Sequence, residues 1–136
     1  MLKLAFVVPL LAGSAQVTAA TEPSRAPTEF SREGLEFFEQ KIRPLLVERC
    51  YECHSAEAKK LKGGLRIDSR EGFLKGGDSG PAIVPGQPEK SLLIKAVHYT
   101  DEDLKMPPHH QLPAEQIGNL EEWVKMGAPD PRRATA

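Results

Sequence analysis

The chain has 136 residues, which is enough for one small domain and a leader, and only 6% of the residues are aromatic. Its formal net charge of −1 lacks the basic excess of nucleic-acid-binding proteins, so no nucleic-acid partner is expected. The side chains of one such domain bury a modest core at best.

The first 20 residues have the pattern of a secretory signal peptide. Lys3 supplies a positive charge, residues 4–12 form a short apolar stretch, and small residues follow at 17–20. The apolar stretch is far shorter than the roughly 20 residues of a membrane-spanning helix. We therefore expect cleavage after Ala19 or Ala20, no integral membrane segment afterwards, and a periplasmic or otherwise exported protein. An uncleaved, membrane-associated N-terminus is the alternative.

The remaining chain divides into three parts by composition. Residues 21–30 contain two prolines and no apolar periodicity, so we predict a flexible spacer. A folded domain is predicted over residues 31–130, and residues 131–136 are predicted to form a disordered tail.

A helix is predicted to begin at Ser31, which suits the N-cap position, because apolar residues then recur at helical spacing. This stripe consists of Leu35, Phe38, Ile42, Leu45 and Leu46. Pro44 lies within the stripe and lacks a backbone N–H, so it should kink or break the helix, or open a second short one. In each case a helix leads into Cys50.

The helix is followed by Cys50-Tyr51-Glu52-Cys53-His54, which holds the only two cysteines in the sequence. A Cys-x-x-Cys pair with a histidine directly after it is the pattern of c-type haem attachment. Positions three apart lie on one face of a helical turn, so both thiols can form thioether bonds to one porphyrin. His54 can then place an imidazole nitrogen on the iron.

Three other interpretations of the cysteine pair compete with haem. A thioredoxin-like redox disulfide requires a βαβ setting, which the sequence does not indicate. A structural zinc site requires four ligands, whereas Cys50, Cys53 and His54 provide three, two of them adjacent. A plain structural disulfide is the third alternative.

The chain from residue 59 to residue 88 is rich in glycine and proline, which indicates a long loop with one helical turn at 69–74. A loop of this length is unusual inside a small domain unless it encloses something, so we expect it to wrap the haem. Its apolar residues, which are expected to touch the haem or fill a small core, are Leu65, Ile67, Phe73, Ile83 and Val84.

Two further helices are predicted, one from Pro88 to about Val97 and one opened by Pro113 and ended by Gly127. Apolar residues line one side of each: Leu92, Leu93, Ala96 and Val97 in the first, and Ile117, Leu120, Trp123 and Val124 in the second. The polar, proline-broken stretch between them contains Met106-Pro107-Pro108.

Met106 is the residue we expect to ligate the iron opposite His54. Two successive prolines stiffen the loop that carries it, and a stiff loop can hold a weak thioether ligand in place. Met126, at the end of the last helix, is expected to pack instead. The remaining alternatives are the histidines His98, His109 and His110.

Several runs of residues together resemble the planctomycete-type cytochrome c domain. The haem motif is common to c-type cytochromes, and the Gly-Gly-Leu-Arg and Pro-Gly-x-Pro-x-x-Ser runs are the specific part. The similarity extends over about residues 35–130, in the runs at 50–54, 62–70, 76–81, 85–91, 105–108 and 123–128.

The resemblance implies a small, all-α cytochrome c-like fold whose long Gly/Pro-rich loop wraps one covalently attached haem c. Cys50 and Cys53 would attach the haem, with His54 as the proximal and Met106 as the distal ligand. Arg66 is a candidate partner for a haem propionate.

The expected function is the transfer of single electrons between redox partner proteins, without catalysis. The alternatives are a haem-based ligand-binding or sensor protein, and an electron-entry module docked on a separate enzyme.

Overall fold

The computed structural model of the chain describes residues 30–134. The signal peptide expected over residues 1–20, nearly all of the spacer expected over 21–30 and the last two residues of the chain lie outside the described residues.

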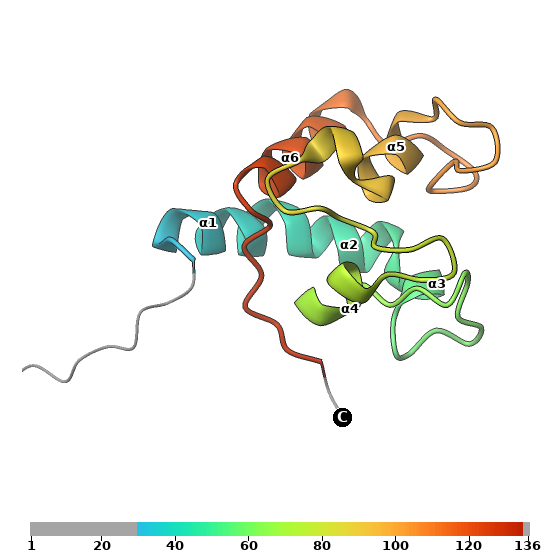
Figure 1. The fold of residues 1–136 in the computed structure, drawn as a ribbon, viewed down its shortest axis with the longest axis horizontal. Helices are drawn as coiled ribbons and strands as arrows, with labels where there is room; N and C mark the ends of the chain where they lie inside the picture. Colours follow the sequence, from blue (N-terminus) through green and yellow to red (C-terminus); the bar gives the residue numbers. More distant parts are fainter. Residues whose placement is uncertain (1–29, 135–136) are drawn as a thin grey trace, which may run out of the picture.

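Every regular element of the described residues is helical, which confirms the predicted all-α class (Figure 1). Besides these helices, residues 30–134 contain one isolated β-bridge, between Gly77 and Gly80. Within this described part of the chain, no helix combines the length and the apolar character that a membrane-spanning helix requires. In chain order, the elements are α1 (Arg32–Phe37), the π-helical turn η1 (Phe38–Ile42), α2 (Arg43–Arg49), α3 (Tyr51–His54), α4 (Arg70–Lys75), the 3-10 turn η2 (Pro88–Lys90), α5 (Leu92–His98) and α6 (Ala114–Lys125).

The predicted first helix forms as three consecutive segments, α1, η1 and α2. Ser31 caps it as expected, because its hydroxyl oxygen accepts a hydrogen bond from the N–H of Gly34 at 3.1 Å. Pro44 lies in the first turn of α2, where a missing N–H is tolerated. In η1, just before it, the N–H of Arg43 bonds the carbonyl oxygen of Phe38, five residues earlier. Of the three outcomes expected at the proline, the chain therefore opens a new helical segment.

The core lies where this first helix packs against α6. The ring of Trp123 is fully buried, 5.9 Å from the ring of Phe38 and 5.2 Å from that of Phe73 in α4. Aromatic pairs at such separations add to the stabilisation that buried apolar area provides. The most completely buried aliphatic side chains of the same core are those of Ile42, Leu46, Ile67, Ile83, Leu120 and Val124.

The Gly/Pro-rich segment folds back on itself between α3 and η2. It contains α4, close to the helical turn predicted at residues 69–74. The carbonyl oxygen of Gly63 accepts a hydrogen bond from the N–H of Asp78 at 2.8 Å. This bond joins the start of the Gly/Pro-rich segment to the residues just after α4. At Gly76, φ is 71° and a Cβ atom would collide with the carbonyl oxygen of Gly80, so only glycine fits this turn. Of the segment's apolar residues, Ile67, Phe73 and Ile83 are buried in the common core.

The chain after α6 differs from the disordered tail predicted from residue 131 onward. The side chains of Asp130 and Arg132 form an ion pair at 2.6 Å and are 0% and 8% exposed. The Arg132 guanidinium also lies 4.9 Å from the centre of the Phe38 ring, and the N–H of Ala134 bonds the carboxylate of Glu71. Figure 1 shows this segment running back past the first helix toward α4. These contacts join residues far apart in the chain, so no local pattern in the sequence signals them.

Candidate functional site

The two cysteines lie at the end of the first helix, on one short turn. Cys50 separates α2 from α3, and its carbonyl oxygen accepts the backbone N–H groups of both Cys53 and His54, at 3.2 and 3.0 Å. This turn therefore brings together three of the four predicted site residues. Both thiols are free and partly buried, so neither kind of disulfide considered above joins them.

Burial raises the pKa of the Cys50 thiol to about 12, against the opposing effect of the neighbouring Arg49. A thiol that remains protonated at neutral pH is a slow partner in disulfide exchange. Moreover, no three Cys, His, Asp or Glu side chains of residues 30–134 are grouped as metal ligands. The two observations disfavour the redox-disulfide and zinc interpretations, respectively.

The imidazole of His54 is partly buried, and its Nδ1 atom lies 3.3 Å from the backbone carbonyl oxygen of Leu65. A carbonyl oxygen can only accept, so this contact assigns the ring proton to Nδ1 and leaves Nε2 with a free lone pair. The backbone beside it is fixed as well: the N–H of Ile67 bonds the His54 carbonyl oxygen at 2.8 Å, and the N–H of Lys62 bonds that of Cys53 at 3.1 Å. Residues 62–67 thus hold the turn and orient the imidazole.

The fourth predicted residue, Met106, is placed by a separate loop between α5 and α6. Its backbone N–H bonds the carbonyl oxygen of Ala96 in α5 at 3.0 Å, and the residue is 36% exposed. The side-chain amide of Gln111 donates to the carbonyl oxygens of Val97 and His98 at 3.2 and 3.0 Å. The loop is therefore tied to the C-terminal end of α5. Figure 1 shows this loop and α3 at the same end of the molecule.

Contrary to the expectation that it packs, Met126 is 39% exposed, and it lies away from the cysteine turn. Met126 caps the C-terminus of α6, and shortly after it Pro129 packs against Gly34, near the start of the first helix. Cys50 follows Gly34 by 16 positions along the first helix, which corresponds to roughly 24 Å at about 1.5 Å per residue.

The three histidines considered as alternative ligands differ in their surroundings. His98 is engaged on the surface, where its Nε2 atom lies 2.7 Å from a carboxylate oxygen of Glu121. His109 and His110 are exposed in the same loop as Met106. His109 and His110 therefore remain the alternative distal ligands that lie in the same loop as Met106.

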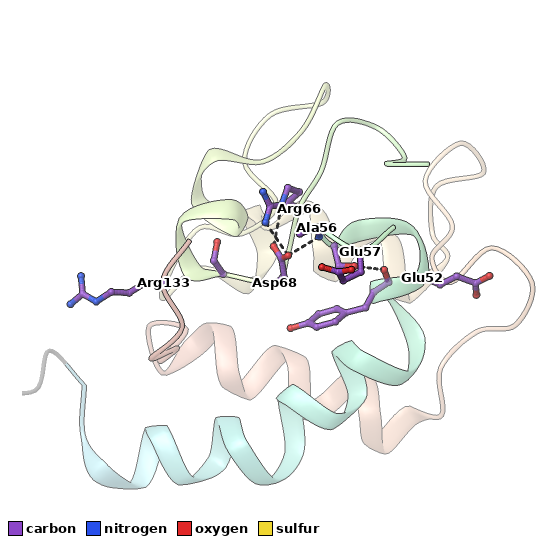
Figure 2. A pocket seen from close by; sticks show the side chains of 9 residues that line it. Glu52, Ala56, Glu57, Arg66, Asp68 and Arg133 are labelled. Carbon is purple, nitrogen blue, oxygen red and sulfur yellow. Dashed lines mark hydrogen bonds and ion pairs between the residues drawn. The ribbon is translucent and has the colours of Figure 1, made fainter. Parts of the chain in front are cut away.

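A pocket of about 430 Å³ lies beside the cysteine turn (Figure 2). Arg66, the residue considered for a propionate, forms an ion pair with Asp68 at 3.1 Å. The same carboxylate accepts the N–H of Ala56 at 2.7 Å. Burial alone would raise the pKa of Asp68, but these donors outweigh it and hold that pKa below its ordinary value. The pocket is lined by Tyr51, Glu52, Ser55, Ala56, Glu57, Arg66, Asp68, Ser69 and Arg133.

Two residues outside the predicted site support the cysteine turn, one of them directly and the other through the first. The Arg132 guanidinium donates a hydrogen bond to the hydroxyl of Tyr51, which lies between the two cysteines in the sequence. Asp130 holds that guanidinium through two hydrogen bonds, at 2.9 and 2.6 Å. The Asp-x-Arg spacing near the end of the chain was the only available signal, and on its own it is a weak one.

The comparisons with known proteins agree with the resemblance stated above. The family model described as Planctomycete cytochrome C matches residues 50–110, a span that begins at Cys50 and includes Met106. No curated protein and no solved structure matches the chain. The family match identifies residues 50–110 as a domain of the planctomycete cytochrome C family.

Proposed function

We propose that the protein is an exported cytochrome that holds one haem c and passes single electrons between redox partner proteins. A cytochrome c domain implies a haem-based electron-transfer role and haem c as the cofactor. The observation that carries the more specific proposal is the single turn on which Cys50, Cys53 and His54 lie, with both thiols free and the imidazole oriented.

The residues of this turn fit a covalently attached haem. Cys50 and Cys53 would each form one thioether bond, and His54 would offer Nε2, whose lone pair the contact with Leu65 leaves free. Because the sequence has only these two cysteines, it provides for one such attachment. When bound, the haem supplies an iron that alternates between the ferrous and ferric states.

Met106 is the proposed distal ligand. It is exposed rather than packed in the core, and its loop is fixed to α5 by backbone and side-chain hydrogen bonds. Met126 is a weaker candidate because it lies near the start of the first helix. His98 is weaker because it pairs with Glu121. Methionine–histidine ligation raises the reduction potential relative to two histidines, and it leaves no open position for a substrate. The proposed role is therefore electron transfer without catalysis.

The haem would lie between the cysteine turn and the Met106 loop, with the segment around α4 wrapped beside it. The hydrogen bonds from Lys62 and Ile67 to the turn support this arrangement, because they fix the start of that segment against Cys53 and His54. Export is proposed from the signal-peptide pattern of residues 1–20 and agrees with the periplasmic attachment of haem c in bacteria.

Two measurements on the haem-loaded protein test this function. A potentiometric titration followed by absorbance should show a single one-electron transition, and carbon monoxide should leave the spectrum of the reduced protein unchanged. Rapid carbon monoxide binding would instead support a ligand-binding or sensor protein. More than one transition would contradict a single haem.

A further inference from the structure

Tyr99 ends α5 in a backbone conformation that tyrosine rarely adopts. Its φ and ψ are 60° and 24°, in the left-handed region where glycine and asparagine are the usual residues. Helices ordinarily end in this way without a large side chain. A large aromatic side chain at this position is therefore unusual.

That side chain contacts the residues on both sides of Met106. The Tyr99 hydroxyl donates a hydrogen bond to the carbonyl oxygen of Pro107, the residue directly after the methionine. The ammonium group of Lys105, the residue directly before it, lies 5.9 Å from the centre of the Tyr99 ring. The Lys105 ammonium is itself held by the carboxylate of Glu102 at 2.6 Å.

The backbone completes the same arrangement. The carbonyl oxygen of Ala96 accepts the N–H of Tyr99 at 3.3 Å and the N–H of Met106 at 3.0 Å, so one acceptor joins the end of α5 to the loop. The Met106 side chain, in contrast, is among the exposed large hydrophobic groups. The hydrogen bonds that fix this part of the loop are therefore made by its backbone, at Met106 and Pro107.

We propose that Tyr99 is the positioning residue for Met106: its hydroxyl holds the backbone directly after the distal thioether, and its ring lies beside the side chain of Lys105 directly before it. This inference rests on the proposed function. A ligand held by its supporting contacts stays on the metal more of the time than one on a free loop, because it loses less conformational freedom when it binds. Tyr99 would thereby set how readily an outside ligand displaces the methionine.

The test uses Tyr99→Phe, which removes only the hydroxyl, in the haem-loaded protein. The readouts are the weak charge-transfer band of an iron–thioether bond in ferric protein and the affinity of the iron for added imidazole. We expect the band to disappear at a lower temperature than in wild type. Imidazole should bind about fivefold more tightly, the factor that corresponds to the loss of one ordinary hydrogen bond. An unchanged band and an unchanged imidazole affinity would overturn the inference.

Two further variants separate positioning from general stability. Ser91→Ala removes a buried hydroxyl at the other end of α5, where it bonds Val84 and Gln87, and should lower the unfolding temperature without changing imidazole binding. Tyr99→Asn suits the left-handed backbone, so it should fold well but bind imidazole more tightly than wild type. Equal effects of Ser91→Ala and Tyr99→Phe on imidazole binding would contradict a positioning role.

Amide hydrogen exchange at Met106 distinguishes failure of this inference from failure of the proposed function. If wild type lacks the charge-transfer band, Met106 is not the distal ligand and the proposed ligation is wrong. Faster exchange of the Met106 N–H in Tyr99→Phe would still show that Tyr99 holds the loop backbone, because that N–H bonds the carbonyl oxygen of Ala96. Unchanged exchange would overturn it.

Discussion

The Nδ1 atom of His54 lies 3.3 Å from the backbone carbonyl oxygen of Leu65. This contact joins the cysteine turn to the Gly/Pro-rich segment that follows it and fixes which imidazole nitrogen is free. Because the same segment also bonds the backbone of Cys53 and His54, it holds the C-terminal end of the turn. The protein fold therefore orients the His54 imidazole through contacts of its own residues.

Removing both cysteines tests the attachment. The Cys50→Ala/Cys53→Ala variant, expressed in a host that matures haem c, should contain no covalent haem, because these are the only thiols. Each single variant should keep one thioether bond. Intact-mass spectrometry of denatured protein measures this directly, and a double variant that still carries the mass of a haem would be incompatible with attachment at these residues.

The buried ion pair after α6 should contribute strongly to stability. Arg132→Ala leaves the Asp130 carboxylate buried without its partner, and we expect a loss of about 3–5 kcal/mol in the free energy of unfolding. The adjacent Arg133→Ala is the matched control, because Arg133 is exposed and its removal should change stability by about 0.5 kcal/mol or less. Urea unfolding measures both. Similar values for the two variants would mean that the segment does not pack as the structure shows.

Asp68 should make stability depend on pH. Its pKa is lower in the folded protein than the ordinary 3.8, so the ionised carboxylate stabilises the fold above pH 3.8, and this contribution is lost as the pH falls toward the folded value. Asp68→Asn should therefore be less stable than wild type at neutral pH, with a difference that shrinks below about pH 4. Denaturant midpoints over this range test the prediction, with Glu57→Gln in the same pocket as control. A pH-independent difference would argue against the pair with Arg66.

Two glycines should respond in opposite ways to alanine. Gly76→Ala introduces a Cβ atom against the Gly80 carbonyl oxygen at a φ of 71°, so it should destabilise the fold by more than about 1 kcal/mol. Gly118→Ala adds a methyl group to α6 where nothing lies within 4 Å, and should stabilise by roughly 0.5–1 kcal/mol. Thermal unfolding of the two variants provides the comparison. A tolerated alanine at residue 76 would show that the turn is built differently.

The sequence predicted the elements whose signals are local. The Ser31 cap, the apolar stripe before Cys50, the helical turn at 69–74 and the last helix with Trp123 all follow from caps and periodicity, and each forms. The cysteine turn could be recognised for the same reason, because five consecutive residues carry the motif. Its chemical role remains a prediction, as does the role of Met106.

The remaining features depend on contacts between distant residues. Residues 131–136 are predicted to be disordered, yet Arg132 is fixed by Asp130, Phe38 and Tyr51 together. Similarly, nothing near Tyr99 in the sequence indicates a left-handed backbone that places its hydroxyl at Pro107. Contacts between residues about 80 positions apart, such as that of Arg132 with Tyr51, can be identified only in the folded structure.

The most direct test of the central claim is the absorption spectrum of the protein purified from a host that matures haem c, recorded before and after extraction with acidified acetone. We predict a six-coordinate, low-spin haem, with a weak charge-transfer band in the ferric protein at the near-infrared end of the visible spectrum. The haem should stay with the protein after extraction, and Met106→Ala should remove the band but not the haem. A protein without haem, or one whose haem is fully extracted, would contradict the account.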